Sequence, residues 1–517
     1  MEFSQLNLLL HRVPQARICG LSWAICTEAS EGGLSVRQQR TDRTTTLISC
    51  LLLLATCGCN RGQGSKALTT PSVLAAKSPS APESTGIERY CGSEIKAGRI
   101  LVKRRHSGQF EESNFLAQVN TIANDKVATE KIGDTDVLVV RSTTGRSVEN
   151  LLESFNDAKK KAPASIDYVE PDYVIRLDSL PTDPDDPGVA NQWGLGKISA
   201  FSAWQVPTDD KVVVAIIDSG IDYNHEDLQG NIWSSPPGFS VQIGGKTIRC
   251  PIGSHGFDAT AADTDTDEKK CNPWFANGHG THVAGIIGAA NNKSGGRGVD
   301  SKANIMAIKF TDEFGEGCVS TVLRALDFIA AASKSVNIRV INCSFGFNLD
   351  QFYACHSNPQ ILLAALQRID SANILIVASN GNEHLDTSTN PQYPSGYSLP
   401  NLIAVMATDE NDKAYYASGY DPTSANLIGA PGNGIWSTLP CNTYDYLSGT
   451  SMATPFVSGA AAFVLSNTGD KCDKLTATQL KNDLLENADK IVNGNLENYI
   501  MKGRRLNVDK AVRMCGH

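Results

Sequence analysis

The sequence predicts a three-layer α/β domain with a mostly parallel central sheet, preceded by a smaller α+β domain. Three observations in the second half of the 517-residue chain support the larger domain. Short apolar runs rich in β-branched residues recur without polar alternation, helical stretches separate them, and several runs end in loops that contain glycine. Strands that lack alternation are buried on both faces, which is typical of a parallel sheet covered by helices.

Residues 1–60 are predicted to be an N-terminal extension that carries an export signal. Arginines within 37–43 precede an apolar run at 47–55, which is too short to span a bilayer. The run ends in a pattern that resembles a bacterial lipobox, with Cys57 or Cys59 as the lipidated residue. An unprocessed hydrophobic stretch is the alternative.

Residues 61–94 are predicted to form a disordered linker, because Ser, Pro, Ala, Thr and Gly leave it little apolar surface to bury. The next segment, 95–177, shows the order strand–helix–strand–strand–helix–strand, which is the split βαβ arrangement of ferredoxin-like domains. Its expected strands and helices include 99–103, 111–123, 136–141, 148–160 and 166–174.

Residues 178–517 are predicted to form the larger α/β domain. Its expected strands are 212–217, 305–309, 340–343, 374–378 and 402–407. Ligands of such sheets bind at the carboxyl ends of the strands. The residues with distinctive chemistry fall at these ends.

Three sequence strings combine a carboxylate, an imidazole and a hydroxyl. Asp218 directly follows the run 212–217, His279 lies between two glycines where a helical run begins, and Ser451 lies in the string 449–459 at the start of another helix. An aspartate can orient an imidazole, and the imidazole can take a proton from a serine and return it. A helix N-terminus also favours the negative charge that develops at the serine.

Together, and in the order Asp, His, Ser, these strings resemble the subtilisin family of serine proteases, over residues 185–510. The resemblance implies a secreted serine endopeptidase with Asp218, His279 and Ser451 as its catalytic triad and an acyl-enzyme intermediate. It places the oxyanion-binding side chain on Asn382, with the backbone N–H of Ser451 as the second donor. It implies no cofactor for catalysis.

Further segments resemble the family's substrate-binding strands and loops. The implied substrate-binding residues are Gly315, Glu316, Gly317, Ser344, Phe345, Gly346, Ser379, Asn380 and Gly381. An extended peptide held between such strand edges gains main-chain hydrogen bonds with little demand on its sequence. Glu316 is expected to face solvent, and a weak preference for basic substrate side chains is the alternative. Asn380 is the alternative oxyanion donor.

The segment 95–177 is similar to the family's inhibitory pro-domain, including its ending at 168–174. The resemblance implies a zymogen whose pro-domain assists folding, inhibits in cis and is removed by self-cleavage between residues 176 and 182. A permanent N-terminal binding domain is the alternative. Two rivals to an active protease remain, namely an inactive scaffold with the same fold and an enzyme locked permanently by its pro-domain.

The resemblance also implies a structural calcium ion held by oxygens of three loops, from Asp186, Asp227 and Asn292. Alternating aspartates at 263–267 lack the glycine and terminal glutamate of an EF-hand loop, so a solvated acidic insertion is favoured there over a calcium site. His282 is expected to be a packed core histidine, because further metal ligands at helical spacing are absent nearby.

The 14 cysteines predict disulfides in an exported chain. The expected pairs are Cys250–Cys271, which closes an insertion loop, Cys472–Cys515, which ties down the C-terminal segment, and Cys318–Cys355. Cys441 has no obvious partner, and Cys343 is expected to be a small buried core residue.

The net charge of −9 gives no reason to expect a nucleic-acid partner. The expected partners are protein or peptide substrates and the chain's own pro-domain, and the enzyme is expected to be a monomer. Its expected location is extracytoplasmic, either secreted or anchored as a lipoprotein of a bacterial cell envelope.

Overall fold

The computed structural model describes residues 87–90, 93–105, 112–133, 135–161, 165–177, 192–209, 212–261, 265, 267–292, 295–348, 359–468, 471–492 and 496–514. All of them belong to one unit of the chain, Glu83–His517. The predictions for residues 1–60, including the lipid-anchor candidates Cys57 and Cys59, lie outside these residues. The predicted calcium ligand Asp186 lies outside them as well.

A central sheet forms the middle layer of the large domain. Within the described residues its strand order is β20-β21-β17-β16-β14-β12-β6-β10-β9, and every neighbouring pair is parallel except β20 with β21. In that order the strands span Asp489–Lys490, Arg504–Arg505, Leu427–Pro431, Leu402–Thr408, Leu375–Ser379, Ile338–Cys343, Val213–Asp218, Asn304–Lys309 and Gly256–Asp258. The five strands predicted from apolar runs are confirmed as β6, β10, β12, β14 and β16.

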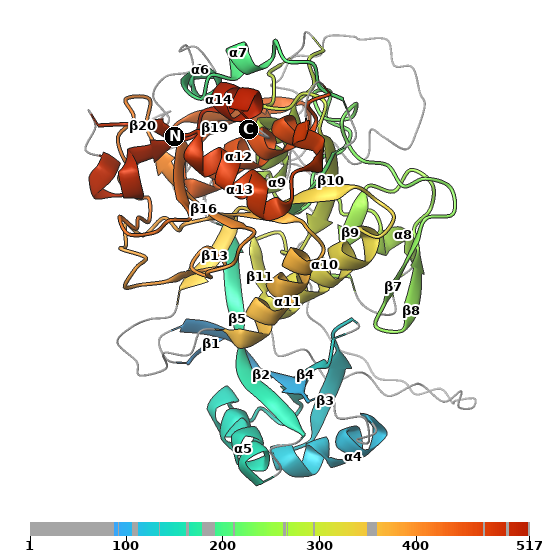
Figure 1. Ribbon diagram of the computed structural model, residues 1–517. Helices are drawn as coiled ribbons and strands as arrows, with labels where there is room; N and C mark the ends of the chain where they lie inside the picture. The colour runs from blue at the N-terminus through green and yellow to red at the C-terminus, as the bar shows by residue number, and fades with distance from the viewer. Residues whose placement is uncertain are drawn as a thin grey trace, which may run out of the picture. The chain divides into compact units, whose positions relative to one another are not determined.

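Helices cover both faces of this sheet (Figure 1). Strand β6 shows why, because Val213, Ala215 and Ile217 belong to one buried cluster while Val214 and Ile216 belong to another. Helices α10 (Val319–Ala332) and α11 (Gln360–Ser371) pack in the first cluster. Helices α9 (His279–Gly288), α12 (Thr450–Leu465), α13 (Ala477–Glu486) and α14 (Val508–Met514) pack in the second. The predicted three-layer α/β architecture is confirmed.

Shorter elements complete the large domain. They are α6 (Trp193–Lys197), α7 (Ala200–Ala203), α8 (Asp267–Lys270), β7 (Ser240–Ile243), β8 (Lys246–Arg249), β11 (Glu316–Cys318), β13 (Phe345–Asn348), β15 (Gln392–Tyr393), β18 (Ile435–Leu439), β19 (Thr443–Leu447) and the 3-10 turns Lys471–Lys474, Leu496–Asn498 and Met501–Gly503. In the part of the chain that the structure describes, no helix combines the length and the hydropathy needed to cross a membrane.

The small domain, residues 87–177, has an antiparallel sheet in the order β5-β2-β4-β3, with β1 beside β2. Its elements are β1 (Ile87–Tyr90), β2 (Ser93–Arg104), α4 (Glu112–Ala123), β3 (Val127–Lys131), β4 (Val137–Ser142), α5 (Val148–Lys161) and β5 (Ile166–Leu177). The linker prediction is wrong for residues 87–90, 93 and 94, which lie in strands β1 and β2. There the Glu88 carboxylate accepts the N–H groups of Gly98 and Val148, which fastens β1 to the edge of the sheet.

Strand β5 belongs to both domains. Its first part pairs with β2, and its last residues pair antiparallel with β11 and β13 of the large domain. Tyr173 of β5 stacks on Phe347 of β13 with ring centroids 5.4 Å apart. The small domain is therefore joined to the large one through a shared strand and shared apolar packing.

Two carboxylates of β5 also cap helices of the large domain. Glu170 accepts the N–H of Gln360 at 2.8 Å where α11 begins. Asp172 accepts the N–H and hydroxyl of Ser320 at 3.2 and 3.0 Å where α10 begins, and it pairs with Arg99 at 2.9 Å. Helix N-termini present unsatisfied N–H groups, and both carboxyl groups accept hydrogen bonds from them, so both contacts stabilise the docked small domain.

The predicted disulfide between Cys250 and Cys271 is present. Cys318 is a buried free thiol, so the predicted Cys318–Cys355 pair is wrong. Cys318 lies in β11 opposite Val174 of β5, and this strand pairing accompanies the burial of the thiol. Burial, and then the charge of Asp172, raises the pKa of the Cys318 thiol to about 12.

Two further cysteines take part in disulfides. Cys472 is disulfide-bonded, and its predicted partner Cys515 lies outside the described residues, so that pairing stays a prediction. Cys441, for which the sequence suggested no partner, is disulfide-bonded as well. Cys343 is free and buried in β12, as expected.

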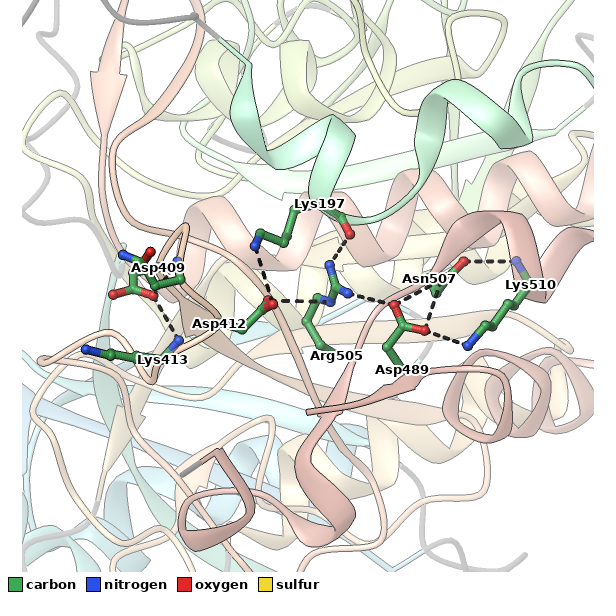
Figure 2. Close-up of polar contacts among 9 residues, drawn as sticks. Lys197, Asp409, Asp412, Lys413, Asp489, Arg505, Asn507 and Lys510 are labelled. Carbon is green, nitrogen blue, oxygen red and sulfur yellow. Dashed lines mark hydrogen bonds and ion pairs between the residues drawn. The ribbon is translucent and has the colours of Figure 1, made fainter. Parts of the chain in front are cut away.

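A polar network fastens the C-terminal strands β20 and β21 (Figure 2). The buried guanidinium of Arg505 bonds the carboxylate of Asp489 at 2.6 Å, lies 3.6 Å from a carboxylate oxygen of Asp412 and donates to the main-chain carbonyl of Lys197. Asp489 also accepts from Lys510 at 2.6 Å. One arginine thus connects β21 with α6, a surface loop and β20.

Candidate active site

A carboxylate and an imidazole meet at the end of β6, where the triad was predicted. Asp218 is the last residue of the strand and is fully buried. Its Oδ1 and Oδ2 lie 2.8 and 3.0 Å from Nδ1 of His279, and Oδ1 also accepts the N–H of Ser219 at 2.8 Å. With Nδ1–H directed to the carboxylate, the ring is held in one orientation and Nε2 is left as an acceptor.

A glycine next to the histidine makes this contact possible. His279 opens helix α9, and its N–H is bound by Oδ1 of Asn277 at 3.0 Å. A Cβ added at Gly280 would lie 2.3 Å from the carbonyl oxygen of Gly220 and 3.0 Å from Oδ1 of Asp218. Only glycine therefore lets the helix begin directly against the end of β6.

Ser451 lies in the first turn of α12, as predicted. Its Oγ donates to the carbonyl of Ser344 at 3.1 Å, and the Ser344 hydroxyl donates to the carbonyl of Ser451 at 2.9 Å. Within the described residues, Nε2 of His279 is buried and has no hydrogen-bond partner. Catalytic hydrogen bonds often tighten only once substrate is bound, so an open Nε2 fits a base for Ser451.

Asn382 is held by its side-chain oxygen. Oδ1 accepts the N–H of Thr450 at 3.0 Å and its hydroxyl at 3.2 Å. In the described part of the chain, the Nδ2 of Asn382 is buried and makes no hydrogen bond. A buried donor without an acceptor is costly, so it indicates a group that meets its partner only when a ligand is present. The oxyanion that forms when a serine attacks a peptide carbonyl is a partner of this kind.

The predicted substrate strands flank the last residues of β5. On one side Gly317 and Glu316 of β11 pair with Ile175 and Arg176, and on the other side Phe345 and Gly346 of β13 pair with Leu177 and Arg176. Residues 174–177 of the chain therefore lie as an extended strand where the sequence predicted that substrate binds.

The remaining predicted substrate residues lie around these strands. The hydroxyl of Ser379 donates to the carbonyl of Phe345 at 3.3 Å, which joins the loop after β14 to β13. Asn380 points into its own loop, where Nδ2 donates to Thr387 and Oδ1 accepts from Ser395. Asn380 is thus engaged elsewhere, whereas Asn382 has a buried Nδ2 to offer.

Three glycines shape the backbone around the last residues of β5. Gly315 turns the chain into β11 with a φ of 78°, and a Cβ added at Gly317 would lie 2.5 Å from the ring of Phe310. At Gly381, a φ of 85° turns the chain between Asn380 and Asn382. Glu316 is half-buried rather than fully exposed, which differs from the expectation that it faces solvent.

His282 is a core residue, as expected. Its Nε2 lies 3.1 Å from the carbonyl oxygen of Asp445, and burial lowers its pKa to about 3. A neutral, enclosed imidazole of this kind suits helix packing rather than proton exchange.

The residues proposed for calcium are only partly described. Asp227 is fully buried, and its Oδ2 accepts the N–H of Gly296 at 2.7 Å. Among the described residues its buried Oδ1 has no hydrogen-bond partner. The amide nitrogen of Asn292 donates to the carbonyl of Glu226, beside Asp227. An orphaned carboxylate oxygen in this loop region fits a hard cation, although no group of three metal-binding side chains is found in the described chain.

Two carboxylates of the acidic insertion at 263–267 lie in the described part of the chain. Asp265 pairs with Lys269 at 3.0 Å, and Asp267 accepts the N–H of Arg249 at 2.9 Å. Both carboxylates therefore have protein partners.

Two residues near the site were not predicted from the sequence. Thr450 orients Asn382 through two hydrogen bonds, and Asn342 donates to Ser344 at 2.9 Å while accepting from Ser458 at 2.8 Å. Thr450 lies directly before Ser451 in the string that identified the serine, so its position was a usable signal. Asn342 lies in an apolar strand, and its role depends on contacts that the sequence does not reveal.

A buried Asp–His pair, a serine in the first turn of a helix and an open amide donor, all at one edge of a parallel sheet, define a serine hydrolase site with the chain order Asp, His, Ser. Residues 209–516 match the subtilase family of peptidases (Peptidase_S8). The chain belongs to this family, and it is a subtilisin-like serine endopeptidase.

Individual relatives agree with this assignment. The chain is 33% identical to Thermitase of Thermoactinomyces vulgaris over 332 residues, which are 64% of this chain and 99% of that protein. It is 34% identical to Subtilisin E of Bacillus subtilis (strain 168) over 313 residues, 59% of this chain and 67% of that one. Among solved structures, fervidolysin from Fervidobacterium pennivorans, a keratinolytic enzyme related to subtilisin, shares the fold with a TM-score of 0.58 at 23% identity, over 83% of this chain and 62% of that one.

Proposed function

We propose that this chain is the zymogen of an exported endopeptidase that cleaves proteins by acyl transfer to Ser451. The observation that carries the proposal is a pair of buried groups that make no hydrogen bond within the described residues, namely Nε2 of His279 as proton acceptor and Nδ2 of Asn382 as hydrogen-bond donor. Both groups are buried, and both acquire partners when a peptide carbonyl is attacked.

In the first half of the reaction, His279 takes the proton of Ser451 Oγ while Oγ attacks the peptide carbonyl. Asp218 holds the imidazole and stabilises its protonated form. The carbonyl oxygen becomes an oxyanion, which accepts hydrogen bonds from Nδ2 of Asn382 and the N–H of Ser451. His279 then returns the proton to the leaving amine, and the acyl-enzyme forms.

In the second half, His279 takes a proton from water, and the resulting hydroxide attacks the acyl carbon. The same two donors hold the second oxyanion. Collapse of this intermediate breaks the bond to Ser451 Oγ, which recovers its proton from His279. The cycle consumes water and needs no cofactor for the chemistry.

Serine-directed labelling tests this assignment. A fluorophosphonate should add one equivalent to the peptide that contains Ser451, as read by mass spectrometry. His279→Ala should abolish labelling, because the serine then lacks its base. A His282→Ala variant that folds should still be labelled, since His282 lies in the core. Labelling of a different residue, or equal labelling of the His279 variant, would contradict the triad.

The small domain is proposed to be the inhibitory pro-domain. Support comes from β5, whose residues 174–177 lie between β11 and β13 in the place expected for substrate. Leu177 pairs with Phe345, one position after Ser344, and the main-chain carbonyl of Ser344 accepts from the hydroxyl of Ser451. We therefore expect the scissile bond shortly after Leu177, within the predicted range that ends at residue 182.

Protein segments that can extend are the proposed substrates. Pairing on both sides of β5 uses backbone groups, so it demands little of the substrate's sequence. Glu316 lies opposite Arg176 in the register, which supports a weak preference for a basic side chain at that substrate position. Glu316→Gln should weaken this preference in a peptide-library profile without changing the others.

Calcium is proposed to stabilise the loops around Asp227. Removal with EDTA should lower Tm, and added calcium should restore it, because a buried carboxylate oxygen is left uncompensated without the ion. In Asp227→Asn the calcium-dependent part of the Tm should disappear. An EDTA effect that survives in this variant would place the ion elsewhere.

The proposed location is outside the cytoplasm. Support comes from the disulfide between Cys250 and Cys271 and from the disulfide bonding of Cys441 and Cys472, because such bonds persist in oxidising compartments. A lipid anchor at Cys57 or Cys59 and a monomeric mature enzyme complete the proposal. Mass analysis of the membrane-bound precursor, with Cys57→Ser and Cys59→Ser compared singly, would identify the anchor.

A further inference from the structure

We propose that the disulfide-closed hairpin β7–β8 is a second anchor for the small domain, separate from the active-site cleft, and that it slows release of the inhibitor after self-cleavage. The inference rests on the proposed role of the small domain as pro-domain. The hairpin is the anchoring surface of the large domain, and residues 127–133 of the small domain are its partner.

The contact is made by two glycine turns. Gly133 follows β3 of the small domain, and Gly244 forms the tip of the hairpin. A Cβ added at Gly244 would lie 2.6 Å from the carbonyl oxygen of Gly133 and 3.1 Å from its Cα. The two backbones therefore touch, and any side chain at Gly244 would displace the small domain.

Helix α10 also contacts the turn at Gly133. A Cβ added at Gly133 would lie 1.5 Å from Oδ2 of Asp327. The backbone of the turn therefore lies against the side chain of Asp327, a buried residue of the helix. One turn before Asp327 on the helix, Arg324 forms an ion pair with Glu130 of β3. The end of β3 thus lies between the hairpin tip and α10.

The hairpin β7–β8 is held by its turn, by buried side chains and by a disulfide. Register pairs Ile243 with Lys246 across a two-residue turn whose glycines, Gly244 and Gly245, have φ values of 58° and 72°. Positive φ at both positions is the type I′ geometry that matches strand twist. Val241 and Ile243 are buried, β7 packs on α10, and the Cys250–Cys271 disulfide closes the insertion behind β8.

Away from the two glycine turns, β3 and the hairpin are not in close contact. A cavity of about 540 Å³ lies between β3 and the hairpin, and its lining includes Lys131, Lys246, Lys270, Arg324, Glu130 and Asp267. A space of this size, lined by these charges and by the apolar side chains of Ile243, Ile248 and Phe257, has room for water. The contact therefore depends on the glycine tips and the ion pair, so a single side chain at the tip should have a large effect.

The anchor lies at the edge of the small-domain sheet farthest from the cleft. In the order β5-β2-β4-β3, strand β5 enters the cleft and strand β3 reaches the hairpin. Two attachments on opposite edges of one rigid sheet act as a bivalent ligand, because the second rebinds at high effective concentration when the first opens. Cutting the chain after β5 therefore leaves the inhibitor attached at both edges.

Matched variants of the full chain test the proposal. Gly244→Asn and Gly245→Asn place the same side chain at neighbouring positive-φ positions, and asparagine tolerates this conformation. Only the first meets the small domain, because a Cβ at Gly245 has no atom within 4 Å. After self-cleavage, the lag before protease activity appears and the fraction of small domain that co-elutes with the enzyme are measured.

We expect Gly244→Asn to shorten the lag about three- to tenfold and Gly245→Asn to leave it unchanged. Glu130→Gln, which alters only the small domain's side of the ion pair, should shorten it as well. The kcat/KM of the fully activated enzymes should be equal. If the lags of Gly244→Asn and Glu130→Gln equal those of Gly245→Asn and the parent chain, the proposed anchor is overturned. Absence of cleavage or activity in the parent chain would instead overturn the proposed function.

Discussion

The side chain of Asn382 is positioned by what its oxygen binds. Thr450 supplies both of the hydrogen bonds to Oδ1, so the amide is fixed and Nδ2 is turned away from that threonine. Because Thr450 immediately precedes Ser451, the proposed donor and the proposed nucleophile are aligned by one turn of α12. This arrangement provides the preorganised donor that an oxyanion requires.

Removing the donor should lower the rate of the chemical step. In a subtilisin, loss of one oxyanion donor is known to reduce kcat by about 10²–10³, and we expect a decrease of this size in Asn382→Ala with little change in KM. Thr450→Val removes only one of the two bonds that hold the amide, so its kcat should fall by a smaller factor, about tenfold. Steady-state kinetics on an extended peptide would measure both. A change confined to KM would argue against an oxyanion role.

Residues that act locally could be predicted from the sequence. Asp218, His279 and Ser451 each lie in a string whose neighbours supply the strand end, the glycine or the helix start that positions them. Contacts between distant segments could not be predicted. Asn342 reaches Ser344 and Ser458 only after β12 packs beside α12, and the free thiol of Cys318 reflects its burial against β5.

At the scale of elements, the apolar strands were predictable because both of their faces are buried. Short strands at edges carry no such pattern. Strand β1, Ile87–Tyr90, is too short to show a pattern, and it forms a strand because β2 and the Glu88 carboxylate hold it. Strand β21 consists of two arginines, and its place in the sheet depends on the carboxylates around Arg505.

This dependence gives a stability prediction for the C-terminal strands (Figure 2). Arg505 is 7% exposed, so Arg505→Met should leave the Asp489 and Asp412 carboxylates without their buried partner and cost about 3–5 kcal/mol of unfolding free energy. Lys510→Met removes an exposed partner of the same Asp489 and should cost under about 1 kcal/mol. Urea unfolding of variants that also carry Ser451→Ala avoids self-digestion. Equal costs would show that the network does not fasten the strands.

The same network predicts a response to acid. Burial alone would raise the pKa of Asp489, but hydrogen bonds from Lys510 and Asn507 and the charges of Arg505 and Lys510 outweigh it and lower the pKa. A lowered pKa contributes stability above the ordinary value of 3.8, and this contribution is lost as the pH falls through the lowered pKa. The C-terminal strands should therefore open under acid conditions before the neutral core of the sheet.

At the scale of the whole molecule, the small domain is held at the cleft by buried carboxylates. Burial raises the pKa of Glu170 to about 7, although the N–H groups of Gln360 and Ile361 and the charge of Lys159 oppose the rise. The docked state therefore binds a proton more tightly than the released domain, whose Glu170 has the ordinary value of 4.5. By linkage, docking is strongest below the ordinary value and weakens as the pH rises through about 7.

We accordingly expect the small domain to leave the cleaved complex faster at about pH 8 than at about pH 5. Glu170→Gln cannot titrate and should flatten this dependence. The test is the release rate of the small domain measured by size-exclusion chromatography over that range of pH. A release rate that falls with rising pH in the parent chain, or an unchanged slope in the variant, would contradict the role of Glu170.

The central claim is that the chain is an active protease that processes itself, and intact mass with N-terminal sequencing tests it most directly. The purified parent chain is compared with Ser451→Ala after folding in the presence of calcium. The account predicts a large domain in the parent that begins shortly after Leu177, and an uncut variant. An uncut parent chain, or identical cleavage in both, would contradict the account.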